Sequence, residues 1–180
     1  MARCVDYLIL GSGAAGHYAA ETIREQDSRG SILILTEEST PTYKRPMLSK
    51  SPLIRFKKDR LSVCGEAWYR EQRIETLYHC RILSLDAGKK CVETDVGEFH
   101  YQKCLYALGG YNFVPPFPGH ELCGVLTVRR TEDLRMIKEY ALGENNAVVI
   151  GGGVIGLEIA LEMQRYGLQV TVLEASPRLM

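Results

Sequence analysis

Two apolar stretches of this chain each run into a Gly-x-Gly-x-x-Gly turn, and this duplication limits the possible folds more than any other feature. The stretches are YLILGSGAAGHYAA, residues 7–20, and VVIGGGVIGLEIA, residues 148–160. Each apolar run is typical of a buried strand, and the residues after each turn suit a helix. A further β-rich run follows, SILILT after the first helix and QVTVLE after the second. Both segments therefore predict a parallel strand–helix–strand unit.

The first turn has the glycine spacing that a dinucleotide pyrophosphate requires. Gly11 permits the tight turn, Gly13 lets the backbone approach the phosphates, and Gly16 allows close packing of helix on strand. The helix N-terminus offers N–H groups and the positive end of its dipole to the anion. Glu37 follows at about the expected 20 residues beyond the last glycine, where a carboxylate accepts hydrogen bonds from ribose hydroxyls.

The second turn repeats this pattern. Gly151, Gly153 and Gly156 take the same three positions, and Glu174 ends the strand that follows the helix. A carboxylate at that point repels a 2′-phosphate, so the second site is predicted to prefer NADH to NADPH. Two dinucleotide sites in one chain suit a protein in which one site holds a flavin and the other delivers a hydride.

The charge and hydropathy of the chain argue against two classes of partner. Its 180 residues carry 22 Lys and Arg against 22 Asp and Glu, so no basic surface for nucleic acid is predicted. No apolar run approaches the roughly 20 residues that span a bilayer, so no membrane association is expected. Met1 leads within a few residues into the first strand, which leaves no room for a signal peptide and predicts a cytoplasmic protein.

Cysteine and histidine positions predict no metal site. The six cysteines stand far apart, and none forms a C-x-x-C pair. This argues against a zinc knuckle or an iron–sulfur ligand set and predicts reduced, mostly buried thiols. The four histidines have neither metal-ligand spacing nor an adjacent nucleophile, so none is given a catalytic role.

Three further patterns lie between the two units. Residues 40–53 are too rich in proline for regular structure and predict a long loop. Residues 65–80 favour a short helix and then a strand, with Trp68 and Tyr69 as core anchors. Residues 81–110 hold three short β-like runs between glycine-containing turns, which predicts an antiparallel meander.

A proline-rich stretch marks the predicted domain boundary. The prolines of VPPFPGH favour a stiff, extended connector. We therefore predict a first domain over residues 1–114 and a connector with the beginning of a second domain over residues 115–180. Within the latter, Thr131 is the expected N-cap of an amphipathic helix, TEDLRMIKEYAL. The predicted fold class is α/β, with two Rossmann-like units, an antiparallel β-meander and an incomplete second unit.

These motifs together resemble those of a known family. GSGAAGHYAA, LTEE, TYKRPMLSK, YQKCLYALGG, VRRTEDL and VVIGGGVIGLEIA occur in this order and extend over nearly the whole chain. The sequence resembles the pyridine nucleotide–disulfide oxidoreductase superfamily, in particular the branch with rubredoxin reductases, ferredoxin reductases and apoptosis-inducing factor. The resemblance implies that the first domain binds FAD and that the second binds NAD(P)H.

The resemblance also assigns roles to charged residues outside the glycine turns. Glu37, with Glu38 beside it, would hold the FAD ribose, whereas Arg45 would reach the FAD phosphates. Lys50 would reach the isoalloxazine and pair with Glu158, and these two are the predicted catalytic residues. An ammonium there favours the negative charge of reduced flavin, and the carboxylate keeps that ammonium from being buried alone.

The remaining implied contacts complete the predicted cofactor sites. Ile82 would touch the adenine, the ALGG turn with Ala107 and Gly109 would pass close to FAD, and Arg130 would also contact FAD. The full set of predicted cofactor-binding residues is Gly11, Gly13, Ala14, Ala15, Gly16, Glu37, Glu38, Arg45, Lys50, Ile82, Ala107, Gly109 and Arg130 for FAD, and Gly151, Gly153, Val154, Ile155, Gly156 and Glu174 for NAD.

The chain also departs from the family pattern. Residues 38–53 contain no cysteine, so a disulfide-reducing cysteine relay is not expected, and Leu108 stands where the family usually has threonine. Family members are considerably longer, which implies that this sequence is the N-terminal part of such a protein or is completed by another polypeptide. Self-association, or pairing with a missing C-terminal half, is therefore expected.

The implied activity is hydride transfer from NADH to FAD, followed by electron transfer to a small redox protein such as rubredoxin or ferredoxin. An NADH oxidase or the flavin part of a nitrite reductase is an alternative. A flavoprotein subunit or scaffold of a larger complex is another. The basic cluster Arg55, Lys57, Lys58 and Arg60 is either a solvated surface or a dock for an acidic electron-transfer partner.

Overall fold

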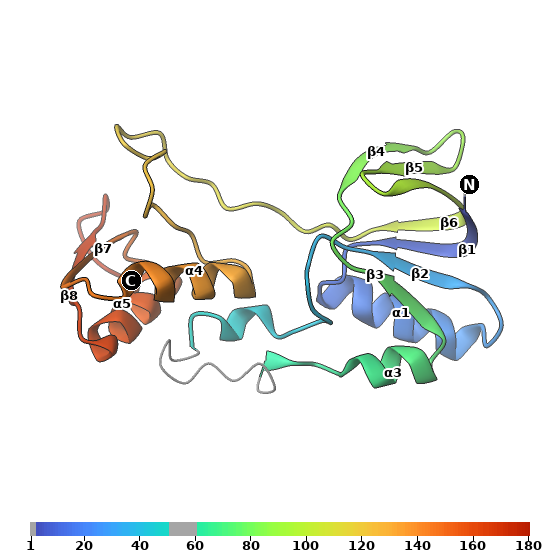
Figure 1. Cartoon of the computed structure of the whole chain (residues 1–180), viewed down its shortest axis with the longest axis horizontal. Helices are drawn as coiled ribbons and strands as arrows, with labels where there is room; N and C mark the ends of the chain where they lie inside the picture. The colour runs from blue at the N-terminus through green and yellow to red at the C-terminus, as the bar shows by residue number, and fades with distance from the viewer. Residues whose placement is uncertain (1–2, 51–60) are drawn as a thin grey trace. The chain divides into compact units, whose positions relative to one another are not determined.

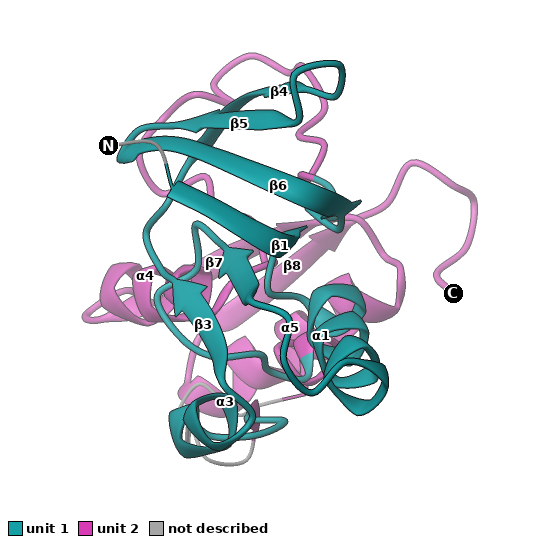
Figure 2. Ribbon diagram, turned by 90° about the vertical axis from the view of Figure 1, so that its right-hand side faces the viewer, with its two compact units in different colours: residues 1–44, 62–110 teal, residues 45–61, 111–180 magenta. Residues whose placement is uncertain are grey.

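A computed structural model describes residues 3–50 and 61–180 of the chain (Figure 1). The basic cluster at residues 55–60 lies outside these described residues. The chain divides into two compact units, which are coloured teal and magenta in Figure 2. The first contains residues 1–44 and 62–110, and the second contains residues 45–61 and 111–180.

A six-stranded sheet forms the centre of the first unit. Its strands are β1 (Arg3–Leu10), β2 (Ile32–Leu35), β3 (Ile74–Leu77), β4 (Ile82–Asp86), β5 (Cys91–Thr94) and β6 (Gly97–Tyr106). They lie in the order β3-β2-β1-β6-β5-β4, with β3, β2, β1 and β6 parallel and β6, β5 and β4 antiparallel (Figure 1). The predicted parallel unit and the predicted meander are thus both confirmed, and β6 joins them, because it pairs in parallel with β1 and antiparallel with β5.

Apolar side chains cover both faces of the parallel strands. In β2, Leu33 and Leu35 belong to one buried cluster, whereas Ile32 and Ile34 belong to another, because successive side chains of a strand point to opposite faces. The first cluster includes side chains of the meander: Val92, Phe99 and Tyr101. Both faces are therefore covered, as parallel strands with continuous apolar runs require.

Two helices contribute to the second of these clusters. They are α1 (Ala14–Gln26) and α3 (Glu66–Glu71). Ala20 of α1 is completely buried and Tyr69 of α3 is 4% exposed, while Trp68 packs against the same cluster. The prediction that Trp68 and Tyr69 anchor the core is confirmed.

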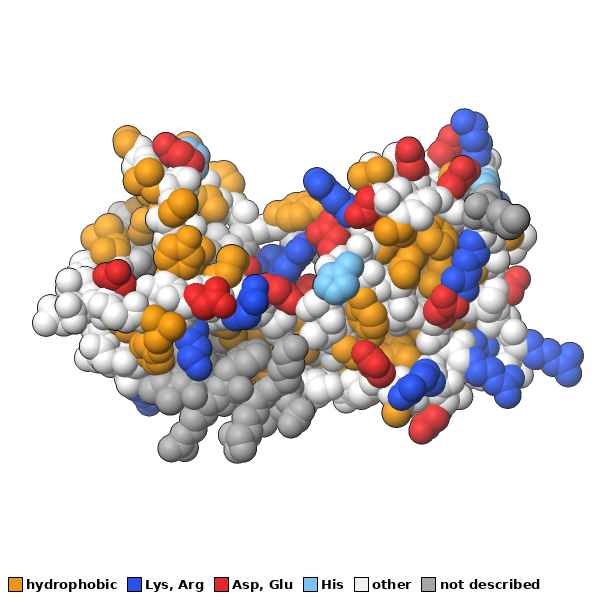
Figure 3. All heavy atoms as spheres, viewed as in Figure 1, with side chains coloured by type: hydrophobic (Ala, Val, Ile, Leu, Met, Phe, Trp, Pro, Cys, Tyr) orange, Lys and Arg blue, Asp and Glu red, His pale blue; other side chains and the backbone are white. Residues whose placement is uncertain are grey.

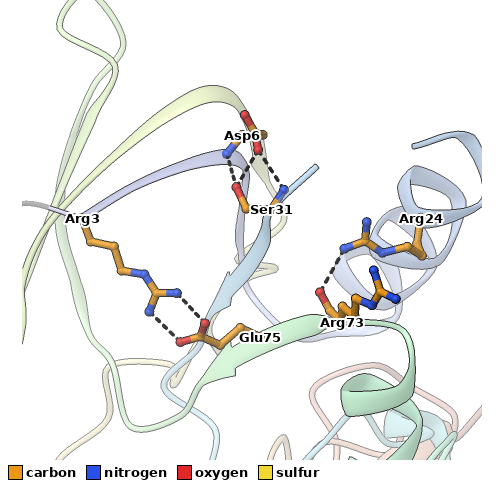
Figure 4. A network of polar contacts seen from close by, with 6 residues as sticks. All are labelled: Arg3, Asp6, Arg24, Ser31, Arg73 and Glu75. Carbon is orange, nitrogen blue, oxygen red and sulfur yellow. Dashed lines mark hydrogen bonds and ion pairs between the residues drawn. The ribbon is translucent and has the colours of Figure 1, made fainter. Parts of the chain in front are cut away.

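Polar contacts join the ends of strands in the first unit (Figure 4). The Asp6 carboxylate accepts hydrogen bonds from the backbone N–H and the hydroxyl of Ser31, at 2.8 and 2.7 Å. The Arg3 guanidinium and the Glu75 carboxylate form a two-bonded ion pair between β1 and β3. These groups lie at the surface, so the apolar clusters carry the main stabilisation of this unit.

The second unit holds a smaller sheet. A turn of 3-10 helix (Arg45–Met47) and α4 (Thr131–Ala141) precede β7 (Asn146–Ile150), α5 (Val154–Tyr166) and β8 (Gln169–Leu173). Among the described residues β7 and β8 pair in parallel with each other alone, which confirms the second predicted strand–helix–strand unit. Gly167 ends α5 at φ +107°, the left-handed conformation that glycine adopts without strain.

One predicted helix boundary is wrong. The N-cap of α4 is Arg130, and Thr131 is the first helical residue. The reason is Asp133, whose carboxylate accepts hydrogen bonds from the backbone N–H groups of Arg129 and Arg130 at 2.6 and 2.8 Å. A carboxylate on the third helical residue satisfies the donors at the helix end and determines where the helix begins.

The proline-rich connector has the irregular backbone that its sequence predicts. Residues 107–117 form neither helix nor strand. The placement of the domain boundary at residues 114 and 115, and the cofactor assigned to each side of it, stay predictions. Within residues 3–50 and 61–180, no helix is long and apolar enough to cross a membrane. Acidic and basic side chains are interspersed on the face seen in Figure 3, in keeping with their equal totals.

Candidate dinucleotide-binding sites

The first glycine turn is closed by its own strands. Gly11 adopts φ +105° and donates a backbone hydrogen bond to the carbonyl of Leu35 at 2.8 Å. A Cβ atom at Gly11 would lie 2.3 Å from the carbonyl oxygen of Ala107, and one at Gly16 would lie 2.0 Å from the carbonyl oxygen of Gly11. Real Cβ atoms do not approach backbone this closely, so both positions require glycine for the turn and for helix packing.

Gly13 differs from these two glycines because it faces open space. It is the N-cap of α1, with φ −66°, and no side chain within the described residues caps this helix end. No atom of the described chain lies within 4 Å of a Cβ built there. The turn therefore leaves open space at the positive end of a 13-residue helix, where an anion is favoured.

The predicted ribose and adenine contacts lie at one edge of the same sheet. Gly11, Glu37 and Ala107 follow the carboxyl ends of β1, β2 and β6, and these strands are parallel. Ligands of such sheets bind at this edge. The Glu37 carboxylate lies 4.0 Å from the Arg81 guanidinium. Ile82 begins β4 and packs partly against the core.

Glu38 makes a side-chain hydrogen bond, whereas Gly109 allows a backbone turn after β6. The Glu38 carboxylate accepts a hydrogen bond from the Tyr43 hydroxyl at 3.1 Å. Gly109 adopts φ +75°, a left-handed conformation that lets the chain turn after β6. Leu108 presents its backbone to Gly11, because its Cα would lie 3.1 Å from a Cβ built there. A leucine in place of threonine is thus compatible with this turn.

A second set of predicted flavin residues belongs to the second unit. The Arg45 guanidinium donates a hydrogen bond to the backbone carbonyl of Arg129, next to the predicted Arg130. Lys50 lies 3.1 Å from the Glu158 carboxylate, which also accepts a hydrogen bond from the Ser49 hydroxyl. The Ser49 hydroxyl, and then the Lys50 ammonium, lower the pKa of Glu158, so this carboxylate is ionised at neutral pH.

The second glycine turn has nearly the same backbone as the first. Gly151 adopts φ +110° and donates to the carbonyl of Leu173 at 2.8 Å, while a Cβ at Gly156 would lie 2.0 Å from the Gly151 oxygen. Gly153 is the N-cap of α5, and within the described chain a Cβ there would have no neighbour within 4 Å. Val154 and Ile155, which follow it, are more than half exposed.

Glu174 lies against this second turn. Its carboxylate accepts hydrogen bonds from the backbone N–H groups of Gly152 and Ser176 at 2.6 and 2.7 Å. The bond from Ser176, followed by that from Gly152, lowers the pKa of Glu174. The negative charge predicted to discriminate between the two nicotinamide cofactors is therefore present beside the glycine turn.

Sequence and structure comparisons now identify the family. The family described as pyridine nucleotide-disulphide oxidoreductase matches residues 5–180. The chain belongs to this family. A rubredoxin–NAD(+) reductase of Pseudomonas putida is 36% identical over 96% of this chain and 46% of its own length. An NADH oxidase of Methanocaldococcus jannaschii is 34% identical over 96% of this chain and 41% of its own length.

Solved structures give the same result. A ferredoxin reductase from Rhodopseudomonas palustris superimposes with a TM-score of 0.88 at 30% identity, over 97% of this chain and 44% of that structure. The chain thus spans less than half the length of each of these three relatives. The α/β fold with dinucleotide-binding units is that of the family.

The cofactors of this pyridine nucleotide–disulphide oxidoreductase family are FAD and NAD(P)H. The residues present fit such groups, because the glycine at each helix N-cap, Gly13 in one turn and Gly153 in the other, faces open space within the described structure. A side chain at either position would occupy that space. FAD at the first turn and NAD at the second stay predictions, as do the individual contacts.

A buried hydrogen-bond network behind the first turn was not predicted. The Thr42 hydroxyl donates to the carbonyl of Ser12 at 2.7 Å and lies 2.7 Å from the Tyr69 hydroxyl. The Ser12 hydroxyl lies 2.8 Å from that of Thr36, and the Tyr69 hydroxyl lies 2.9 Å from Nδ1 of His17. Burial lowers the pKa of His17 and raises that of Tyr69, so both stay uncharged at neutral pH. The network holds the turn in place.

Proposed function

We propose that this chain supplies the FAD- and NADH-binding elements of an NADH-dependent oxidoreductase that reduces a small redox protein of the rubredoxin or ferredoxin type. The observation that carries the proposal is the duplicated turn, in which the N-cap glycines Gly13 and Gly153 face open space within the described structure. Support for the acceptor comes from the rubredoxin–NAD(+) reductase and ferredoxin reductase among the relatives.

Bound FAD supplies the chemistry of accepting a hydride and releasing electrons one at a time. The chain's own residues bind and orient the two cofactors. The turn at Gly11 and the helix N-terminus after it hold the FAD pyrophosphate, and Glu37 holds its ribose. Holding both cofactors in one geometry converts a bimolecular encounter into an effectively unimolecular one.

Lys50 and Glu158 act together in this proposal. The Lys50 ammonium supplies positive charge, which favours a reduced flavin that carries negative charge. Glu158, at 3.1 Å, balances the ammonium when no such charge is present. Because residues 38–53 contain no cysteine, no thiol step in that segment takes part.

Gly13 offers a direct test of the flavin site. In Gly13→Ala the new methyl group enters open space at φ −66°, so the fold is kept, but the methyl would obstruct the close approach to the backbone that a pyrophosphate requires. We expect FAD affinity to fall at least about tenfold, a loss of roughly 1.4 kcal/mol, measured by quenching of flavin fluorescence.

The matched control is Gly65→Ala. Gly65 is the N-cap of α3 and also faces open space in the described structure, but it is not in a glycine turn. This variant should bind FAD as the unchanged protein does. A folded Gly13→Ala protein with undiminished FAD affinity would remove the first turn from the flavin site.

The electron acceptor is tested separately. FAD-loaded protein is reduced with NADH and then mixed with rubredoxin, ferredoxin or dioxygen, and reoxidation of the flavin is followed by stopped-flow absorbance. We expect one of the two proteins to be reduced faster than dioxygen. Fast reoxidation by dioxygen alone would favour an NADH oxidase, an interpretation that the Methanocaldococcus jannaschii relative also supports.

A further inference from the structure

Three side chains of metal-binding type meet on the antiparallel meander of the first unit. Cys91 lies on β5, and Glu98 and His100 lie on β6, the two strands labelled at the upper right of Figure 1. The Cys91 sulfur, a Glu98 carboxylate oxygen and a His100 ring nitrogen all lie within 4.8 Å of one another. The spacing of these three residues in the sequence matches no metal-binding motif, because a hairpin turn separates Cys91 from the other two.

The strand register explains why they meet. Cys91 and His100 are directly paired across the antiparallel ladder. Glu98 stands two residues before His100, and residues two apart on a strand lie on the same face. One oxygen of the Glu98 carboxylate lies 2.9 Å from the Cys91 sulfur and 2.9 Å from Nε2 of His100. The three groups thus converge before any metal is bound.

We propose that Cys91, Glu98 and His100 form a zinc-binding site on this hairpin. Thiolate, imidazole and carboxylate are the three ligand types that Zn²⁺ uses in proteins, and three protein ligands leave one tetrahedral position for water. Hard cations such as Mg²⁺ prefer oxygen ligands and waters, so a set with one sulfur, one nitrogen and one oxygen selects against them.

The surroundings suit a cation. Asp86 pairs with Cys91 from β4, and Glu93 pairs with Glu98 across the hairpin, so two further carboxylates border the group. Lys89 offsets part of this negative charge, because its ammonium lies 3.4 Å from the Asp86 carboxylate. Cys91 and His100 are half-buried and Glu98 is exposed, which leaves the ligand atoms open to solvent on one side.

A metal at this position would join two strands. It would link β5 to β6 through one ligand from the former and two from the latter. Binding to the folded form alone stabilises the fold by mass action, so Zn²⁺ should raise the melting temperature of the unit that contains the hairpin. This site is separate from the glycine turns and does not depend on the oxidoreductase proposal.

The test is a metal titration of the whole chain in its reduced state. Zn²⁺ affinity is measured by competition with a chromophoric chelator, and Co²⁺ replaces Zn²⁺ as a spectroscopic probe. We expect one tight site, a thiolate-to-cobalt charge-transfer band and no displacement by a large excess of Mg²⁺. Loss of an outer partner of a metal site weakens affinity about 10- to 100-fold, so Cys91→Ser and His100→Ala should each lose at least that much.

Matched controls separate this group from other thiols and imidazoles. Cys123→Ser removes an exposed cysteine, and His120→Ala removes a histidine that also has a carboxylate beside it, Glu121 at 3.2 Å, but that belongs to no group of three ligand atoms within the described residues. Both should bind Zn²⁺ unchanged. Far-UV circular dichroism checks that each variant is folded, and Glu98→Gln, which keeps the shape of the side chain, should also weaken binding.

Three results would overturn the proposal. The first is unchanged Zn²⁺ affinity in folded Cys91→Ser and His100→Ala, and the second is an equal loss in the two controls. The third is a cobalt complex that lacks the thiolate charge-transfer band and from which Mg²⁺ displaces the cobalt. That result would mean that only carboxylates bind the cation.

Discussion

The two strand–helix–strand units share a local structure but differ in what surrounds it. Gly11 and Gly151 adopt φ +105° and +110°, and each donates a hydrogen bond at 2.8 Å to the last residue of the following strand. Gly16 and Gly156 both come so close to the preceding turn that a Cβ would lie 2.0 Å from a carbonyl oxygen. The same glycine spacing thus produces the same turn in two different surroundings.

The strands before the two turns have different environments. Leu8, Ile9 and Leu10 of β1 are completely buried, because β1 lies between β2 and β6. In β7, which within the described residues pairs with β8 alone, Val148 and Ile150 are 59% and 56% exposed. An apolar strand thus gains its stabilisation from the neighbouring strands, whereas the same glycine spacing gives the same turn in both surroundings.

The largest effect should come from shortening a buried side chain. Leu8→Ala is expected to destabilise the first unit by about 2–5 kcal/mol, whereas Val148→Ala should cost the second unit less than about 1 kcal/mol. Denaturant unfolding followed by fluorescence of Trp68, the single tryptophan, reports on the first unit. Hydrogen exchange of the β7 amides reports on the stability of the second unit. An equal loss of stability in the two variants would mean that β7 is buried in solution.

The next effect concerns the first glycine of each turn. Gly11→Ala and Gly151→Ala both force alanine into a left-handed conformation, but only the former meets an obstacle within the described structure, the Ala107 oxygen at 2.3 Å. Backbone strain of about 1–3 kcal/mol is common to both variants. We expect Gly11→Ala to be the more destabilising, because the collision with the Ala107 oxygen is added to that strain. Thermal unfolding by circular dichroism compares the two, and a larger loss for Gly151→Ala would contradict the observed closure by β6.

A smaller effect is expected for the carboxylate beside the second turn. Glu174→Gln should lower the ratio of the flavin-reduction rate with NADH to that with NADPH about tenfold, or roughly 1.4 kcal/mol. Stopped-flow absorbance measures both rates. Backbone N–H groups lower the pKa of Glu174, so it stays ionised below the usual glutamate range. The preference should therefore persist as pH falls from 7 to about 5 and be lost only below the lowered pKa. A preference that disappears between pH 7 and 6 would contradict this.

The smallest effect should come from the Arg3–Glu75 ion pair, drawn in Figure 4. Both side chains are about half exposed, at 47% and 53%, so Glu75→Gln should destabilise the first unit by less than about 1 kcal/mol. The hydrogen bond from Arg3 lowers the pKa of Glu75, so the contribution is present above the ordinary glutamate pKa and is lost as pH falls through the lowered value. Urea unfolding at pH 7 and pH 3 tests it, and an effect as large as that of Leu8→Ala would mean that polar contacts rather than burial stabilise this unit.

The sequence by itself determined the two turns, the strands and helices around them, the meander and the family. These features depend on short-range patterns, such as glycine spacing and the two-residue period of strands, which act on neighbouring residues wherever the chain folds. The pairing of Lys50 with Glu158 came from the family resemblance rather than from any local pattern.

Only the tertiary structure decided the features that depend on contacts between distant residues. It placed β6 in both the parallel sheet and the meander, and it aligned Cys91 with His100 through the strand register. It also brought Thr42 and Tyr69 behind the first glycine turn. The pattern of a strand determines which of its side chains share a face, but not which other strand pairs with it. Strand pairing depends on the total free energy of burying the apolar faces of the whole unit.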